Sequence, residues 1–255
     1  MRLRLFVSSV VGLVALFAVL IGVWWFFIRS EAEPATAPLA FRDATPTAMA
    51  TDSATATGSP TAPSGTEGAS AGFTRYVIVP QHPAVEGQTE AWYLARETLA
   101  RIGVPSTAKG TTTDVSGEFF LGPEGLDPNN VSRVVVKLEN LRSDESRRDA
   151  RVREALEVTR YPEAAFTIEA IEGWPGEIPE GQDVRLTLVG TMELHGVRRT
   201  IEWETIARRR GDVITALATT KFRYEDFDVP VLNIAGFVSV EEEVTVQIQV
   251  IAVAQ

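Results

Sequence analysis

The sequence lacks cysteine altogether and has only two histidines, His82 and His195, in 255 residues. Without cysteine it can form no disulfide, thiolate metal site, thiol nucleophile or lipidated cysteine. The two histidines are about a hundred residues apart, and no second ligand stands at a recognisable metal-binding spacing, so we expect no resident metal. Because His195 directly precedes Gly196, we expect it at a turn.

Positive charge is also scarce, since the chain has 24 Lys and Arg residues against 34 Asp and Glu residues, which gives a net charge of −10. Nucleic-acid binding requires clustered cations that neutralise phosphates, and no basic stripe is present, so we expect no nucleic-acid partner. The densest basic run is 208–210, three arginines that we expect to be solvated at the tip of a hairpin.

The N-terminal segment carries the only long apolar run. Residues 5–28 are uncharged and follow Arg2 and Arg4, while Trp24 and Trp25 lie near the far end. As a helix this run would span a hydrocarbon core of roughly 30 Å, and the early arginines favour a cytoplasmic N-terminus. We therefore expect residues 1–30 to be a single-pass signal anchor in the cell membrane, with the C-terminal part extracytoplasmic. A cleaved signal peptide is the alternative, although its apolar region is usually shorter.

Residues 31–72 form the next segment and are rich in Ala, Thr, Pro, Ser and Gly. Such a composition buries too little apolar surface to offset chain entropy. We expect a disordered linker here, which leaves residues 73–255 as the folded domain.

From residue 73 onward apolar and polar residues alternate, which predicts antiparallel strands. The expected strands are 75–79, 90–98, 113–121, 133–141, 165–171, 183–194, 197–207, 212–224 and 244–253. Residues 143–159 break this period and predict one amphipathic helix, beginning with Ser143 as its cap. In 244–250, for example, Val246 and Ile248 alternate with Thr245 and Gln247, which predicts a sheet with one dry and one wet face. The fold class is thus all-β, and the period alone allows either a sandwich or a closed barrel.

Three stretches of the chain resemble one known family. They read Ser-Asp-Glu-Ser-Arg-Arg-Asp at 143–149, Arg-Tyr-Pro-Glu-Ala-Ala-Phe at 160–166, and Gly-Thr-Met-Glu-Leu-His-Gly-Val at 190–197. Residues 222–229 and the valine-rich end of the chain from Val244 add to the similarity. Over about 74–254 the chain resembles the YceI-like family. The resemblance implies an extended, lipocalin-like antiparallel β-barrel of about eight strands with a helix beside it, holding a polyisoprenoid. Members are typically periplasmic or secreted.

A barrel of this kind offers a candidate ligand site. The side chains that we expect to line it are Tyr93, Phe119, Val136, Phe166, Met192, Phe222 and Ile248. Burying each methylene of a lipid there would contribute roughly 0.8 kcal/mol. We therefore expect lipid binding, with a polyisoprenoid or quinone as the bound molecule and no catalytic cofactor. The alternative is a core packed solid by the same residues, which would leave a ligand-free interaction domain.

Arg148 is the candidate for a lipid head group, because a prenyl phosphate would need cations beside the mouth of the barrel. It belongs to a cluster with Arg147, Arg151 and Arg153. Ion pairs within the helix explain these arginines more simply, with partners among Asp144, Glu145, Glu154 and Glu157. An enzyme of the hydrolase class would have to use Asp226, Asp228 or His195. We expect a binding protein instead, and the sequence leaves open whether two copies form a homodimer.

Overall fold

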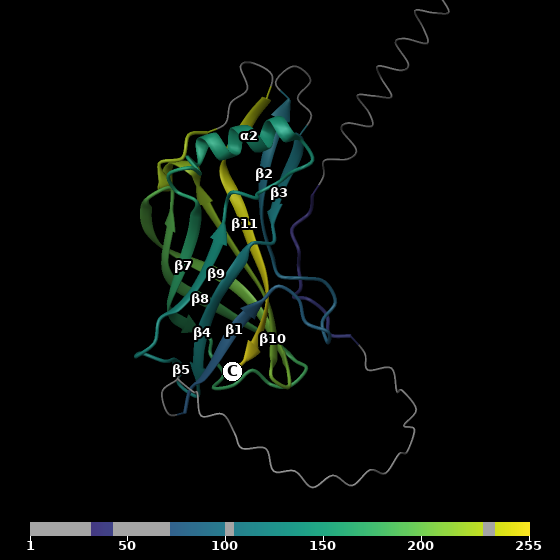
Figure 1. Ribbon diagram of the computed structural model, residues 1–255, viewed down its shortest axis with the longest axis vertical. Helices are drawn as coiled ribbons and strands as arrows, with labels where there is room; N and C mark the ends of the chain where they lie inside the picture. The colour runs from purple at the N-terminus through teal and green to yellow at the C-terminus, as the bar shows by residue number, and fades with distance from the viewer. Residues whose placement is uncertain (1–31, 43–71, 100–104, 232–237) are drawn as a thin grey trace, which may run out of the picture.

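The computed structural model describes residues 32–42, 72–99, 105–231 and 238–255, and in this part of the chain eleven strands form one antiparallel sheet (Figure 1). The strands are β1 (Thr74–Val79), β2 (Glu90–Leu99), β3 (Pro105–Thr112), β4 (Val115–Gly122), β5 (Gly125–Leu126), β6 (Ser132–Lys137), β7 (Glu163–Glu172), β8 (Asp183–Leu194), β9 (Val197–Arg210), β10 (Val213–Arg223) and β11 (Val238–Ala254). A helix, α2 (Ser146–Ala155), and a short 3-10 turn, η1 (Tyr224–Phe227), complete the described elements.

The sheet closes on itself as a barrel of eight strands. Its order is β1-β4-β6-β7-β8-β9-β10-β11, and β1 pairs with β4 on one edge and with β11 on the other. At Val77, for example, the partners are Glu118 of β4 and Val253 of β11. The predicted all-β class, with a closed antiparallel barrel of eight strands and one helix, is confirmed. The sandwich is therefore excluded.

The long strand β11 has different neighbours along its length, and these distinguish two halves of the barrel. Near the C-terminus β11 pairs with β1, from Ile251 to Ala254, and nearer its start it pairs with β2. We call the end that carries α2 the upper half and the end that carries β5 and the C-terminus the lower half (Figure 1). In the upper half the β2–β3 hairpin takes the place of β1 beside β11. The far edge of β3 pairs with no further strand in the described ranges, apart from the isolated bridge between Thr111 and Arg142, so the wall parts there.

All nine predicted strands are present, and the two strands missed by sequence analysis are β3 and β5. The sequence of β3, Pro-Ser-Thr-Ala-Lys-Gly-Thr-Thr, carries no large apolar side chain and therefore lacks the alternation that marks the other strands. It is held by its full register with β2, in which Tyr93 faces Gly110.

Helix α2 lies across the upper end of the barrel (Figure 1) and is shorter than the predicted 143–159. Its N-cap is Glu145, whose carboxylate accepts a hydrogen bond from the backbone N–H of Arg147. The expectation of Ser143 as the cap was wrong, because its hydroxyl instead donates to the buried carboxylate of Asp149 at 2.6 Å. At the other end, Glu157 adopts a left-handed backbone with a φ of 45°, which is incompatible with further helix.

Residues 32–42 lie along the outer wall of the barrel, against β2, β10 and β11, and we call this segment the strap. Its backbone at Ala35 donates to the side-chain oxygen of Gln247 at 2.8 Å and accepts from the side-chain nitrogen at 2.9 Å. Trp92 also donates to this oxygen, at 3.1 Å, and Gln247 is 1% exposed. The strap therefore corrects two expectations, since part of the predicted linker is ordered on the barrel and Gln247 does not face water.

The lower end of the strap is fixed by Phe41, which packs with Val85, Val213 and Ile251. Backbone hydrogen bonds join Arg42 to Ala84 and Glu86 to Ala40, as between two short strands. These contacts bury apolar surface as well as backbone polar groups, and both effects favour an ordered strap.

The arginine run 208–210 was predicted to be solvated, but each of its members has a partner. Arg208 pairs with Asp183 at 2.6 Å, and Arg209 pairs with Glu177 at 2.7 Å. Arg210 donates to the strap carbonyl of Arg42 at 2.9 Å. The run thus fastens neighbouring segments to the end of the β9–β10 hairpin.

No helix in the described ranges is long and apolar enough to cross a membrane. The predicted anchor at 1–30 lies outside the described residues, as does 43–71 of the predicted linker.

Candidate functional site

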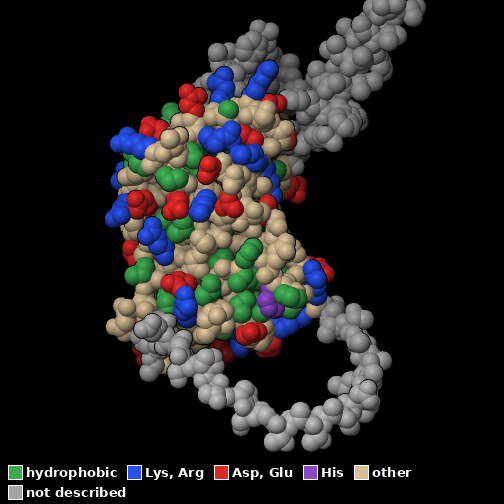
Figure 2. Space-filling view, viewed as in Figure 1, with side chains coloured by type: hydrophobic (Ala, Val, Ile, Leu, Met, Phe, Trp, Pro, Cys, Tyr) green, Lys and Arg blue, Asp and Glu red, His purple; other side chains and the backbone are tan. Residues whose placement is uncertain are grey.

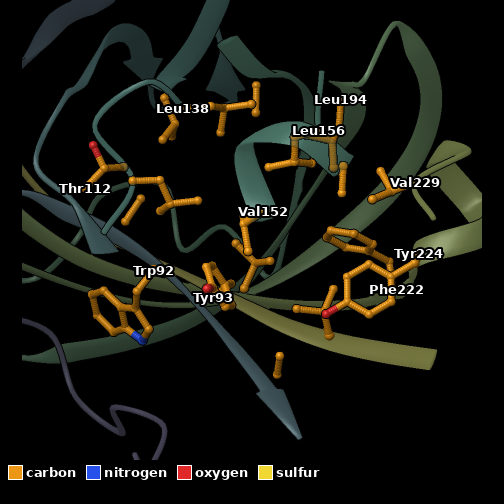
Figure 3. A pocket seen from close by; sticks show the side chains of 18 of the residues that line it. Trp92, Tyr93, Thr112, Leu138, Val152, Leu156, Leu194, Phe222, Tyr224 and Val229 are labelled. Atoms are coloured by element: carbon orange, nitrogen blue, oxygen red, sulfur yellow. The ribbon is translucent and has the colours of Figure 1, made fainter. Parts of the chain in front are cut away.

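A cavity of about 470 Å³ occupies the upper half of the barrel beneath α2. Its walls combine aromatic side chains with small and medium apolar ones from several strands, such as Ala91, Ala95, Val136 and Val246. The helix contributes Val152, and its C-cap residue is Leu156, which also lines the cavity; the close-up in Figure 3 shows Val152 between Tyr93 and Leu156. The upper half is therefore hollow, with an apolar interior that reaches the helix.

Seven of the eight predicted site residues line this cavity. They are Tyr93, Val136, Phe166, Met192, Phe222, Ile248 and Arg148. The exception is Phe119, which lies in the lower half, where its ring stacks on Tyr76 with centroids 5.4 Å apart. The reason is the register of β1 and β4, which places Tyr76 opposite Phe119 in the closed part of the wall. Alternation correctly indicated that Phe119 faces inward but not its height along the barrel.

The position of Tyr93 depends on the glycine across the ladder. A Cβ added at Gly110 would lie 2.3 Å from Cε1 of the Tyr93 ring, far inside van der Waals contact. The absence of a side chain at this position therefore lets the ring lie flat against β3. This close approach keeps Tyr93 at the edge of the cavity.

Charged groups gather where the cavity meets α2. The guanidinium of Arg148 lies 3.4 Å from the carboxylate of Glu97 on β2 and also pairs with Asp144 one helical turn before it. Burial raises the pKa of the Glu97 carboxyl, and Arg148 offsets part of this shift. Burial opposes the charge of Arg148, but Glu97 and Asp144 outweigh it and raise the pKa of the guanidinium. The predicted ion pairing of Arg148 is confirmed for Asp144, whereas the pair with Glu97 was not expected.

Two tyrosine hydroxyls stand beside this ion pair. Burial raises the pKa of Tyr224 to about 12, with the charge of Glu97 adding to the shift, and burial raises the pKa of Tyr93 as well. Both phenols are therefore neutral hydrogen-bond donors near pH 7. Neither hydroxyl has a hydrogen-bond partner in the described part of the chain. In Figure 3 the side chains of Tyr93 and Tyr224 face each other across the cavity.

Arg147 and Arg151 also border the cavity, on the exposed side of α2. Within the described ranges neither side chain has an ion-pair partner, unlike Arg148. Figure 2 shows charged side chains of both signs spread over the upper part of one face of the molecule. The charged groups of the site thus lie where the cavity meets α2, which we call its mouth, and most of the remaining lining is apolar.

The residues considered for hydrolysis have structural roles. The carboxylate of Asp226 accepts from the backbone N–H of Arg223 at 2.8 Å and caps η1, and Asp228 is exposed in a left-handed backbone. His195 lies in the β8–β9 turn, as predicted, with its Nδ1 3.1 Å from the carbonyl of Phe227. In the described part of the chain no hydrogen bond or ion pair links His195 to either aspartate, and no group of three or more potential metal ligands occurs there.

A second and smaller cavity, of about 90 Å³, lies in the lower half. It is bounded mainly by apolar side chains such as Phe119, Leu186, Ile214 and Trp174. Trp174 donates from its indole nitrogen to the carbonyl of Gly122 at 3.1 Å, which fixes its ring near the lower end. The lower half is therefore largely filled by its own residues.

Comparison with known proteins relates this architecture to a family. A UPF0312 protein of Vibrio parahaemolyticus is 28% identical over 144 residues, spanning 53% of this chain and 72% of the relative. A UPF0312 protein of Vibrio vulnificus is 26% identical over 144 residues, with the same shares of 53% and 72%. A solved polyisoprenoid binding domain from Saccharophagus degradans, implicated in plant cell wall breakdown, superposes with a TM-score of 0.52 at 16% identity and covers 71% of this chain and 98% of that one. The YceI-like domain family matches residues 76–252, the barrel from β1 to β11, and the chain therefore belongs to that family.

Proposed function

We propose that this protein binds a long apolar lipid of the polyisoprenoid class in the upper cavity, and that it does so outside the cytoplasm while tethered to the cell membrane. The observation that carries the proposal is the cavity of about 470 Å³, whose lining is mainly apolar and whose charged groups lie at its mouth beside α2. Binding sites for small molecules commonly combine an apolar pocket with a few placed polar groups.

The hydrophobic effect supplies the affinity in this proposal. Each buried methylene contributes roughly 0.8 kcal/mol, so a few isoprene units offset the cost of association and reach micromolar binding. The cavity walls are well suited to a branched chain, since Val136, Val246 and Met192 present methyl groups rather than hydrogen-bonding atoms. Met192 adds an adaptable thioether that fits irregular apolar surfaces.

The head of the lipid would lie at the mouth. The hydroxyls of Tyr93 and Tyr224 can donate to an oxygen of an alcohol or a quinone, and the cations Arg147 and Arg151 can pair with a phosphate. Arg148 is less suited to this role than the sequence analysis expected, because Glu97 and Asp144 already neutralise it. A polyprenol, a quinone and a prenyl phosphate are therefore the three head-group classes to compare.

Two further lines support binding rather than catalysis. The solved Saccharophagus degradans domain with the same fold is named as a polyisoprenoid binding domain. The side chains considered for hydrolysis, Asp226 and His195, are engaged in a helix cap and a turn. We propose the membrane location on the strength of the apolar run at 5–28, which precedes the strap by a few residues.

The direct test is to purify the full-length chain from its native membrane and extract it with organic solvent. We expect mass spectrometry to identify an isoprenoid at close to one molecule per chain. Protein stripped of lipid and then given a long polyprenol should regain it at the same ratio. Recovery of no lipid, together with failure to take up added polyprenol, would refute the proposal.

A further inference from the structure

The two cavities of the barrel are neighbours separated by a ring of four side chains. Val134, Phe166, Trp203 and Ile248 line both the upper cavity and the lower one. They come from β6, β7, β9 and β11, so they approach the barrel axis from several sides. We call these four residues the waist.

Phe166 and Trp203 form the core of the waist. Their ring centroids are 5.7 Å apart with a tilt of 50°, and the side chains are 5% and 2% exposed. Val134 pairs directly with Phe166 across the β6–β7 ladder. Two aromatic rings in contact thus occupy the cross-section between the cavities.

The lower cavity, beyond the waist, has an apolar lining like most of the upper cavity. Apolar residues on inward positions, including Leu188, Ala216 and Ala218, line the lower cavity. No charged residue lines that cavity within the described ranges. A hydrocarbon chain that passed the waist would meet suitable walls, so the rings, and not a change of polarity, end the upper cavity.

We propose that the Phe166–Trp203 pair sets the maximum length of lipid chain that the barrel holds. This inference rests on the proposed function and adds a specificity determinant to it. Chain atoms above the waist contribute to affinity, whereas atoms beyond that limit remain outside the mouth in water. Removing the Phe166 ring joins the two cavities and moves the limit to longer chains.

The experiment measures affinity against chain length for the full-length chain, using native mass spectrometry and a graded series of prenyl alcohols from geraniol to long polyprenols. In the wild type we expect affinity to rise by about fourfold for each further methylene buried, and then to become constant. In Phe166→Ala we expect the constant region to begin at a longer alcohol. Phe166→Leu, a smaller truncation, should shift it in the same direction by less.

A matched variant controls for general loosening of the barrel. Ala216→Leu fills part of the lower cavity while leaving the upper walls unchanged. Alone it should not alter the length profile, but combined with Phe166→Ala it should return the limit towards that of the wild type. Thermal unfolding of each variant identifies any that fail to fold. If Phe166→Ala fails to fold, the length profile of Phe166→Leu still tests the inference.

The outcomes separate the two proposals. If no variant and no wild-type protein binds any prenyl alcohol, the proposed function fails. If all of them bind but the limit is the same in the wild type, Phe166→Leu and Phe166→Ala, the waist has no role in length selection and this inference is overturned.

Discussion

The upper and lower halves of the barrel are made of the same alternating strands and differ in what fills them. In the lower half β1 closes the wall, and Tyr76, Phe119 and Trp174 occupy the interior beside a cavity of about 90 Å³. In the upper half the β2–β3 hairpin departs from the wall, and residues such as Ala95 and Val246 leave a cavity of about 470 Å³.

The difference shows that alternation decides which side chains face inward, while the closure of the wall distinguishes the filled half from the hollow one. Aromatic side chains line both cavities, so their presence alone does not decide whether the interior is filled. Helix α2 then covers the upper end of the larger cavity, with charged groups beside it.

The largest expected effect compares one leucine from each half. Leu186 faces the lower half and Leu138 the upper, and they are 8% and 6% exposed. Leu186→Ala should lower the free energy of unfolding by about 2–5 kcal/mol. Leu138→Ala should lower it by less, because Leu138 borders a cavity of about 470 Å³ and Leu186 one of only about 90 Å³, so the Leu138 side chain has fewer contacts to lose. Urea unfolding measures both, and equal losses would contradict the contrast between the halves.

The strap joins the two halves from outside, and Gln247 is its main polar contact. Gln247→Ala leaves the Trp92 indole and the Ala35 backbone without their buried partner, so it should lower the free energy of unfolding by about 1–3 kcal/mol. Limited proteolysis should then cut the chain near Ala35 faster than in the wild type. Thr245→Ala, on the same strand, is the control, and unchanged stability together with unchanged cleavage would show that the strap is not held by Gln247.

The mouth of the upper half can be tested with two ligands that differ only in their heads. Replacing Arg147 and Arg151 by glutamine should weaken a prenyl phosphate by about tenfold and leave the matching alcohol almost unchanged. Arg133→Gln, an exposed change on β6, controls for net charge. Equal weakening of both lipids would refute head-group recognition by these two cations.

The smallest expected effect is the pH dependence that Glu97 adds to the upper half. Burial raises its pKa in the folded protein. The stability that a raised carboxyl pKa contributes is present below the unfolded value and is lost as the pH rises through the folded value. The stability of the wild type relative to Glu97→Gln should therefore fall as the pH increases through this window. Urea denaturation at a series of pH values measures this difference, and a rise would contradict the assigned direction.

Much of the barrel and its lining follows from periodicity, because inward positions recur at every second residue. The height of Phe119 could not be predicted, since it depends on the register between β1 and β4. The pair of Glu97 and Arg148 was equally inaccessible, because it joins a strand to a helix distant in sequence.

The strap left a signal that sequence analysis did not use. Trp92 and Leu94 are apolar and lie on the face of β2 opposite to Tyr93, which indicates that something covers the outer wall there. The segment that covers this wall could not be identified from composition, because residues 32–42 resemble the linker around them.

The central claim is that the hollow upper half, and not the filled lower half, holds the lipid. Its most direct test is the amount of long polyprenol bound per chain in Val246→Trp, which fills the upper cavity, and in Ala216→Leu, which fills the lower. We predict one molecule per chain in the wild type and in Ala216→Leu, and almost none in a folded Val246→Trp. Full binding by Val246→Trp would contradict the account.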